Sequence, residues 1–269
     1  MDLGIENKRA LITGSTSGIG AGIAKALARE GAAVVIHGRD LERAEGVAVA
    51  IRAEGGRAAV ALGDVSTDEG AAESARRALE AFGGIDILVN NAGGMVGAGQ
   101  VDWMNASVED WASTYSKNTL AAVRMARLMV APMRERRWGR VIQISSVAAT
   151  EPLTSPHYGA TKAALSNFSL ALSKKLSRSG VTCNTVSPGM IRTPALERWF
   201  GKIAAEMGWG DDRERAEAHV LKNLVQQSVD RFGTPEDVGR IVSFLASPLA
   251  DFINGANFRI DGGAAHAVL

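Results

Sequence analysis

RALITGSTSGIG, at residues 9–20, is the stretch of this sequence that decides the expected fold. Its first five residues have the composition of a buried strand, and a helix pattern starts at Ile19. Between them, Gly14, Gly18 and Gly20 allow a tight turn and a close approach of the backbone to a pyrophosphate at the helix N-terminus, where free N–H groups favour an anion. A plain strand-to-helix turn is the alternative, but the position at the start of the first strand–helix unit favours a dinucleotide site.

Strand patterns alternate with alanine-rich helix patterns along most of the chain. The strand patterns lie at residues 9–13, 33–37, 58–63, 85–90, 140–145, 181–187 and 257–261, and the helix patterns at 19–29, 39–54, 67–82, 108–136 and 158–178. Continuous apolar strands are typical of a sheet buried on both faces. We therefore expect an α/β fold with one domain over residues 1–269, a doubly wound (Rossmann) seven-stranded parallel sheet with helices on both faces.

Composition narrows the classes of function. The chain has 269 residues, 46% of them hydrophobic, and a formal net charge of +1, which gives no strong field to attract nucleic acid or an anionic membrane. Its single cysteine, Cys183, cannot form an internal disulfide, and its four histidines lack metal-ligand spacing, so we expect no metal. Because no apolar run approaches the length of a membrane span and no signal-peptide pattern opens the sequence, we expect a cytoplasmic protein.

The second strand pattern ends in HGRD, residues 37–40, and bears on the choice of cofactor. An NAD site places an acid about 20 residues beyond the glycine turn. Here Gly38 leaves room, and Arg39 offers a planar bidentate donor suited to a 2′-phosphate, so we predict NADP(H). Two alternatives remain: Asp40 as the acid, although it stands where a helix N-cap is expected, and Arg39 as a solvated surface side chain.

The stretch HYGATK, residues 157–162, holds one of only two tyrosines in the chain. Positions i and i+4 of a helix lie about 5 to 6 Å apart on one face, so the phenol of Tyr158 and the ammonium of Lys162 should be neighbours. A nearby cation favours the phenolate, and we expect it to lower the pKa of Tyr158. The alternative is an ordinary aromatic residue beside a lysine that reaches to solvent.

Several ordered motifs now stand together: TGSTSGIG (13–20), Asp64-Val65, NNAG (90–93), Asn118, ISS (144–146), Tyr158-x3-Lys162, PG (188–189) and DGG (261–263). In this set the chain resembles the short-chain dehydrogenase/reductase family, and more broadly the 3-oxoacyl-carrier-protein reductases within it. The resemblance implies adenine contacts from Asp64 and Val65 and carboxamide contacts from Ile191 and Thr193. The complete cofactor set expected is Gly14, Ser15, Ser17, Gly18, Ile19, Gly20, Arg39, Asp64, Val65, Asn91, Ala92, Gly93, Tyr158, Lys162, Pro188, Gly189, Ile191 and Thr193.

The resemblance also implies a catalytic tetrad of Asn118, Ser146, Tyr158 and Lys162. Tyr158 would exchange a proton with the substrate oxygen, and Ser146 would stabilise charge that develops there. Lys162 would hold the nicotinamide ribose, and Asn118 would anchor a water that supplies protons to Lys162. Ser145 is adjacent to Ser146, and only the family alignment favours Ser146 over it.

Residues 194–232 interrupt the alternation of strands and helices, and we expect them to form a substrate lid. The expected substrate contacts are Met95, Val96, Ser146, His157, Trp199 and Phe200, which together predict a mostly apolar pocket. A helix at 194–207 that buries the same aromatic residues in a core is the alternative. A basic run, RERRWGR (134–140), and Arg178 lie where arginines of the carrier-protein reductases receive an acidic carrier, although such a run is usually a solvated helix end.

The expected function is therefore NADPH-dependent reduction of a hydrophobic ketone, a 3-oxoacyl thioester being one candidate, to a secondary alcohol. An NAD-dependent secondary-alcohol dehydrogenase of steroid or sugar type is the alternative among enzymes, and an NADP-binding sensor is the alternative without catalysis. Expected partners are the small ketone or alcohol and further copies of the chain, because the resemblance implies a dimer or tetramer built on helices 108–136 and 158–178. An acyl-carrier protein is a weaker candidate.

Overall fold

The computed structural model of this protein describes residues 2–94, 105–151 and 155–266. Seven strands form one sheet in the order β3-β2-β1-β4-β5-β6-β7, and every pair of neighbours is parallel. The strands are β1 (Arg9–Ile12), β2 (Ala33–Gly38), β3 (Arg57–Leu62), β4 (Ile87–Asn90), β5 (Gly139–Ile144), β6 (Val181–Pro188) and β7 (Asn257–Ile260). The predicted fold class is confirmed, and each strand begins and ends within two residues of the range expected from the sequence.

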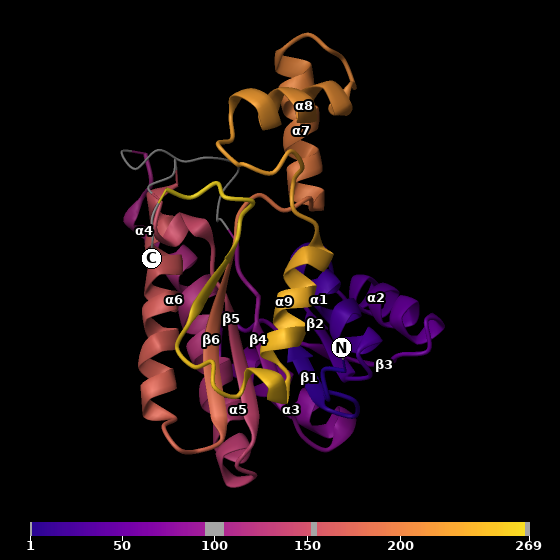
Figure 1. Cartoon of the computed structure of the whole chain (residues 1–269), viewed down its shortest axis with the longest axis vertical. Coiled ribbons are helices and arrows are strands. Elements are labelled where there is room, and N and C mark those ends of the chain that lie inside the picture. The colour runs from indigo at the N-terminus through magenta and orange to yellow at the C-terminus, as the bar shows by residue number, and fades with distance from the viewer. Residues whose placement is uncertain (1, 95–104, 152–154, 267–269) are drawn as a thin grey trace.

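Helices cover both faces of the sheet (Figure 1). One face carries α1 (Gly18–Arg29), α2 (Leu41–Ala53) and α9 (Pro235–Leu245), and the other carries α3 (Asp68–Phe82), α4 (Val108–Tyr115), α5 (Ala121–Glu135) and α6 (Pro156–Lys175). Strand residues alternate between the two cores: Leu11 packs toward α3 and α5, and Ile12 packs toward α1 and α9. Both cores are apolar, which explains why the strands read as continuous apolar runs. Within the described ranges, no helix combines the length and the apolar character needed to cross a membrane.

The helix predicted over 108–136 contains a π-helical segment at Ser116–Leu120, between α4 and α5. Such segments are rare, and they occur frequently at functional sites. Asn118 lies within this segment, and its side-chain Nδ2 donates to the carbonyl of Thr114, one turn earlier. Sequence periodicity does not reveal a π-helical turn, because the apolar pattern on either side remains helical.

Residues 194–232 fold largely as two helices, α7 (Pro194–Glu206) and α8 (Arg213–Asn223), which project beyond the carboxyl ends of the strands (Figure 1). We call residues 194–232 the lid. It has an apolar core of its own, made of Leu196, Phe200, Ile203, Ala204, Ala216, Val220 and Phe232. A single parallel bridge, Ile191 to Gly233, joins its two connections to the body of the protein.

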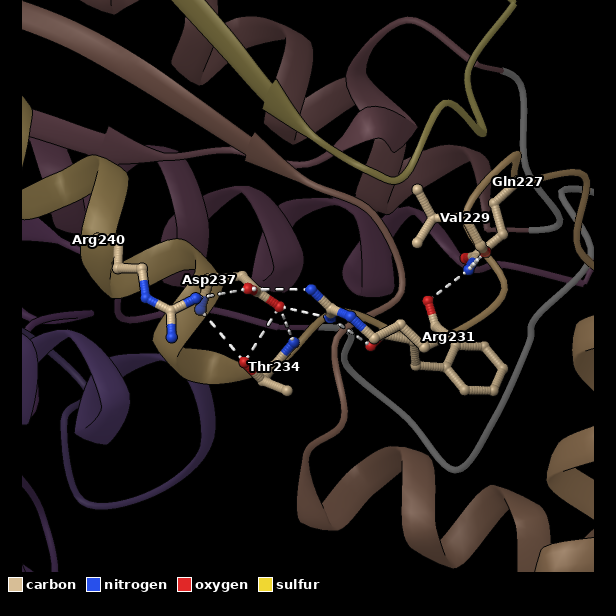
Figure 2. A network of polar contacts seen from close by, with 7 residues as sticks. Gln227, Val229, Arg231, Thr234, Asp237 and Arg240 are labelled. Carbon is tan, nitrogen blue, oxygen red and sulfur yellow. Dashed lines mark hydrogen bonds and ion pairs between the residues drawn. The ribbon is translucent and has the colours of Figure 1, made fainter.

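The returning connection of the lid is fixed to the start of α9 by a polar network around Asp237 (Figure 2). Thr234 and Asp237 form a capping box, and the Asp237 carboxylate also accepts from Arg231 at 2.7 Å and from Arg240 at 3.0 Å. The bond from Arg231 holds the pKa of Asp237 at about 2, so the carboxylate is charged throughout the neutral range. The base of the lid is therefore rigidly tied to a helix of the body.

Helices α1 and α9 approach each other closely enough to exclude side chains at two glycines. A Cβ on Gly22 would lie 2.3 Å from Pro235 Cβ, and a Cβ on Gly239 would lie 2.7 Å from Ala26 Cβ. The helix that follows the glycine-rich turn is thereby packed against the helix that follows the lid. This contact sets where the N-terminus of α1 stands relative to the lid.

We predict that Gly22→Ala destabilises the fold by roughly 1 to 3 kcal/mol, because the added methyl must displace α9. Gly46→Ala is the matched control, since Gly46 lies within α2 with nothing near its Cβ position, and it should stabilise by about 0.5 to 1 kcal/mol. Urea unfolding of both variants measures the difference. Equal effects of the two substitutions would contradict the packing described here.

Candidate active site

The strand order reverses direction between β1 and β4, and the helices that follow these strands lie on opposite faces. In such a sheet a crevice opens at the carboxyl ends of the strands, where ligands bind. A cavity of about 310 Å³ occurs there. Its lining residues are Gly14, Thr16, His37, Gly38, Arg39, Gly63, Asp64, Val65, Ser66, Ala92, Gly93, Gly94 and Lys117.

Glycine is required in the turn after β1 because the chain passes very near its neighbours. Gly14 has φ +65°, and a Cβ there would lie 2.9 Å from Ala92 Cα. A Cβ on Gly20 would lie 2.4 Å from the carbonyl oxygen of Gly14. Asn91 fixes this arrangement, since its Nδ2 donates to the carbonyls of Thr13 and Gly14 at 2.9 and 3.0 Å.

The glycine turn is also held by a buried histidine, His37, which the sequence analysis did not single out. The amide of Gly14 donates to Nδ1 of His37 at 3.2 Å, so the neutral ring carries its proton on Nε2 and donates to Ser74 Oγ at 3.0 Å. Ser74 in turn donates to the carbonyl of Gly70 in α3. Burial lowers the pKa of His37 to about 4, which keeps Nδ1 available as an acceptor at neutral pH.

The adenosine end of the cavity is defined by Gly38, Arg39 and Asp64. A Cβ on Gly38 would lie 2.4 Å from Thr16 Cγ2, so a larger residue, such as the acid of an NAD site, would displace Thr16. Arg39 Nη1 lies 3.5 Å from Asp64 Oδ2, and the Arg39 side chain is 73% exposed. Bonds from the hydroxyl and amide of Ser66, together with Arg39, hold the pKa of Asp64 below its usual range. Asp40 is the N-cap of α2 and accepts from the Arg43 amide, as the sequence suggested.

Some expected cofactor residues face elsewhere with their side chains. The hydroxyl of Ser15 is buried, donates to the Ile12 carbonyl and accepts from the His37 amide, and the Ser15 amide donates to the His37 carbonyl, so neither donor faces the cavity. Ser17 is the exposed N-cap of α1, and the side chain of Ile19 packs against the core of that face.

The cofactor residues expected from the end of β6 onward do not line this cavity themselves. Pro188 ends β6, and Gly189 follows it against Asp261. Ile191 is buried at the bridge to Gly233. Thr193 caps α7 and stands beside Gly18, where a Cβ would lie 3.3 Å from Thr193 Cγ2.

Tyr158 and Lys162 lie on one face of α6, as the spacing predicted. Lys162 Nζ stands 5.6 Å from the centroid of the Tyr158 ring and donates to the carbonyl of Ile144 at 2.8 Å. Lys162 is 3% exposed, and this burial lowers the pKa of its ammonium to about 8. Burial also raises the pKa of the Tyr158 phenol, a rise that a hydrogen bond with Ser146 partly offsets. The expected lowering of the Tyr158 pKa is therefore wrong for this structure, because desolvation of the buried phenol outweighs the hydrogen bond with Ser146.

The two adjacent serines have different surroundings. Ser145 is buried, donates to the carbonyl of Lys162 at 2.9 Å and accepts from Ser166, so its hydroxyl is committed to holding α6 on β5. Ser146 is partly exposed, accepts from the Ala148 amide at 3.2 Å and contacts the Tyr158 phenol. The geometry thus brings Ser146, and not Ser145, next to the tyrosine hydroxyl.

Asn118 is buried, and both N–H groups and the oxygen of its side-chain amide form hydrogen bonds within the protein. Its Oδ1 accepts from the Gly94 amide at 3.0 Å, and its Nδ2 donates to the carbonyls of Gly94 and Thr114. A Cβ on Gly93 would lie 2.4 Å from Asn118 Oδ1 and 3.6 Å from Lys162 Nζ. Gly93 therefore joins the cavity to the buried lysine, and the Asn118 side chain holds this loop.

The structure places the expected substrate residues in different surroundings. Phe200 is fully buried in the lid core against Phe232, with ring centroids 5.3 Å apart, so it does not face a pocket in this conformation. Trp199 packs partly into the same core. His157 is 1% exposed beside Trp111, and both its ring nitrogens lack a hydrogen-bond partner. Met95 and Val96 lie outside the described residues.

The residues present fit a dinucleotide. The glycine turn excludes side chains at the start of α1, where the dipole and free amides favour phosphate, and the cavity continues from there to Arg39 and Asp64. On the other side its lining ends at Gly93 and Gly94, and Gly93 lies close to Lys162, which shares a face of α6 with Tyr158. A nicotinamide dinucleotide has the length and charge that such a path accommodates.

Comparison with known proteins agrees with this site. A family model described as enoyl-(acyl carrier protein) reductase matches residues 14–265. An uncharacterised oxidoreductase of Bacillus subtilis is 36% identical over 100% of both chains, and the 3-oxoacyl-[acyl-carrier-protein] reductase of Aquifex aeolicus is 33% identical over 98% of this chain and 99% of its own. The crystal structure of L-sorbose reductase from Gluconobacter frateurii, complexed with NADPH and L-sorbose, is 34% identical over 100% of both chains, with a TM-score of 0.93.

Fold and site together define an oxidoreductase of the Rossmann type. This chain belongs to the short-chain dehydrogenase/reductase family, as its motifs indicated.

We predict that His37 makes stability depend on pH. The pKa of His37 is about 6.5 in the unfolded chain and about 4 in the folded protein. Between these values the unfolded chain binds a proton that the folded protein does not bind. The free energy of unfolding should therefore fall by roughly 3 kcal/mol as the pH drops from above 6.5 to below 4. His37→Asn should remove this component, whereas His266→Asn, at an exposed position, should retain it. Urea unfolding at several pH values measures the difference between wild type and each variant. A pH-independent difference for His37→Asn would contradict the prediction.

Proposed function

We propose that this protein is an NADPH-dependent carbonyl reductase that converts a hydrophobic ketone to a secondary alcohol, with Tyr158 as general acid. One observation carries the proposal: the Tyr158 phenol contacts Ser146, stands over the buried Lys162 ammonium, and lies where Gly93 links these residues to the dinucleotide cavity. A proton donor, an oxyanion donor and a cation thus gather at one end of the path for the cofactor.

In this proposal, Tyr158 transfers its hydroxyl proton to the ketone oxygen, and Ser146 donates a hydrogen bond to the same oxygen as negative charge develops. When bound, the reduced nicotinamide supplies hydride to the carbonyl carbon. A raised pKa keeps the Tyr158 phenol protonated at neutral pH, which suits reduction. Lys162 stabilises the tyrosinate left behind, and its ammonium is in place below its pKa of about 8.

The preference for NADP(H) rests on Gly38 and Arg39. Thr16 lies against Gly38, so a larger residue at the position that would hold an acid in an NAD site must displace the Thr16 side chain, and Arg39 stands next to it with an exposed guanidinium. The similar L-sorbose reductase binds NADPH, which agrees with this choice. An exposed ion pair contributes little free energy, so Arg39 can leave Asp64 for a phosphate.

The nature of the substrate is a separate part of the proposal. We propose residues 194–232 as a substrate lid within one domain, with Trp199, His157 and the segment of Met95 and Val96 near the substrate and the 3-oxoacyl thioesters as one candidate class. A sugar-type alcohol or ketone is a second candidate, favoured by the likeness to L-sorbose reductase and by the two unpartnered ring nitrogens of His157. We also propose association into dimers or tetramers, a cytoplasmic location and, with less support, contact with an acyl carrier through the basic run at 134–140 and Arg178.

We predict that Tyr158→Phe lowers kcat for ketone reduction by about 10² to 10⁴, the usual contribution of a general acid, while the Kd for NADPH stays within about twofold. Tyr115→Phe is the matched control, because Tyr115 is the chain's other tyrosine and is 41% exposed on α4. A screen of aliphatic ketones, 3-oxoacyl thioesters and ketoses, followed by loss of reduced-cofactor absorbance, supplies the substrate. Unchanged turnover of Tyr158→Phe would refute the assignment, and absence of turnover despite tight NADPH binding would favour a sensor.

We predict that Arg39→Asp reverses the choice of cofactor. The carboxylate should repel the 2′-phosphate and accept from the ribose hydroxyls, so the Kd for NADPH should rise by about 10² and the Kd for NADH should fall or stay constant. Fluorescence titration with each reduced cofactor measures both constants. Tighter binding of NADH than NADPH by the wild type would instead support the NAD-dependent dehydrogenase.

A further inference from the structure

A second cation borders the adenosine end of the cavity. Lys117 comes from the π-helical segment, far in sequence from Arg39 at the end of β2, yet both side chains line the same cavity. Asp64 is the single carboxylate among the described lining residues, and His37 is neutral at physiological pH. The cavity therefore carries two positive groups and one negative group.

The backbone on each side of Lys117 is fastened to the cavity wall. Ser116 Oγ donates to the carbonyl of Ser66 at 3.2 Å, and the Asn118 amide exchanges hydrogen bonds with Gly94 at 3.0 and 2.9 Å. Ser66 and Gly94 both line the cavity. The backbone of Lys117 is consequently held at the rim of the cavity between two anchors, and its exposed side chain starts from that fixed point.

The two cations differ in their counter-ions. Arg39 shares Asp64, whose other oxygen is occupied by the hydroxyl and amide of Ser66. No carboxylate of the described chain forms an ion pair with Lys117. Among the described residues Lys117 therefore has no carboxylate partner, and its neighbour Ser116 bonds to Ser66, on the turn that holds Asp64. A phosphate monoester, with about two negative charges at neutral pH, matches two cations of which one is only loosely paired.

We propose that Lys117 is a second cofactor-specificity residue, which binds the 2′-phosphate of NADP(H) together with Arg39. This inference rests on the proposed use of NADP(H) and adds a second residue to that choice. The lysine acts as a point charge on a flexible stem, and the guanidinium of Arg39 supplies directional donors. Neither group takes part in proton transfer, so the assignment concerns binding alone.

The test uses two adenosine fragments in place of the whole cofactor, so that activity and nicotinamide contacts do not enter. Adenosine 2′,5′-bisphosphate and 5′-AMP differ only in the 2′-phosphate, and calorimetric titration of the full-length protein gives a Kd for each. We expect Lys117→Met to raise the Kd for the bisphosphate about tenfold and to leave the Kd for AMP within about twofold. Lys117→Arg should restore most of the difference, because the charge is retained. Lys174→Met, at an exposed position at the end of α6, is the matched control and should bind both fragments as the wild type does.

The outcomes separate two failures. If the wild type binds the bisphosphate no better than AMP, the proposed use of NADP(H) fails, and the inference fails with it. If the wild type prefers the bisphosphate and Lys117→Met keeps that preference, only the role of Lys117 is overturned. Equal weakening of both fragments by Lys117→Met would place the lysine on the shared part of the ligand, which also overturns the assignment to the 2′-phosphate. Higher salt should reduce the preference of the wild type more than that of Lys117→Met, because one screened contact has been removed.

Discussion

The ammonium of Lys162 is the constraint around which the rest of the site is arranged. A charge buried to 3% exposure needs partners, and it finds one in the carbonyl of Ile144 at the end of β5. That bond ties α6 to the carboxyl end of β5, and the Tyr158 ring lies near the same ammonium. At position 93 only glycine fits, because a Cβ there would lie 2.4 Å from Asn118 Oδ1 and 3.6 Å from Lys162 Nζ. The residues proposed for catalysis and the proposed cofactor path thus meet at one buried cation.

Much of the fold follows from the sequence because its causes are local. Strands buried on both faces must be continuously apolar, and the glycine spacing reports directly on a backbone that passes close to itself at Gly14 and Gly20. The i, i+4 relation of Tyr158 and Lys162 is equally local, and it holds in the structure. By contrast, the support of Gly14 by His37 depends on how β2 meets α3, which no short stretch encodes.

The remaining differences arise from burial, which a sequence pattern does not measure. The direction of the Tyr158 pKa shift depends on the desolvation of both members of the pair, and spacing specifies only their distance. Phe200 was expected at a pocket wall, but the lid contains enough apolar residues to form a core of its own, and the Phe200 ring is buried in that core. The Ser145 and Ser146 pair could not be separated by position, whereas their hydrogen bonds separate them clearly.

The construction of the lid affects how substrate selectivity can evolve in a protein with this fold. Its helices have their own apolar core, whereas the returning chain is held to the body at several points: the bridge from Ile191 to Gly233, the bonds from the Ser228 and Val229 amides to the Gly262 carbonyl, and the ion pair of Arg231 with Asp237. The two helices are therefore separable from the returning chain that follows them. Helices with different recognition properties could replace residues 194–223 while the sheet, the proposed proton-transfer residues and the proposed dinucleotide path keep their positions, so that selectivity and chemistry can diversify separately in this architecture.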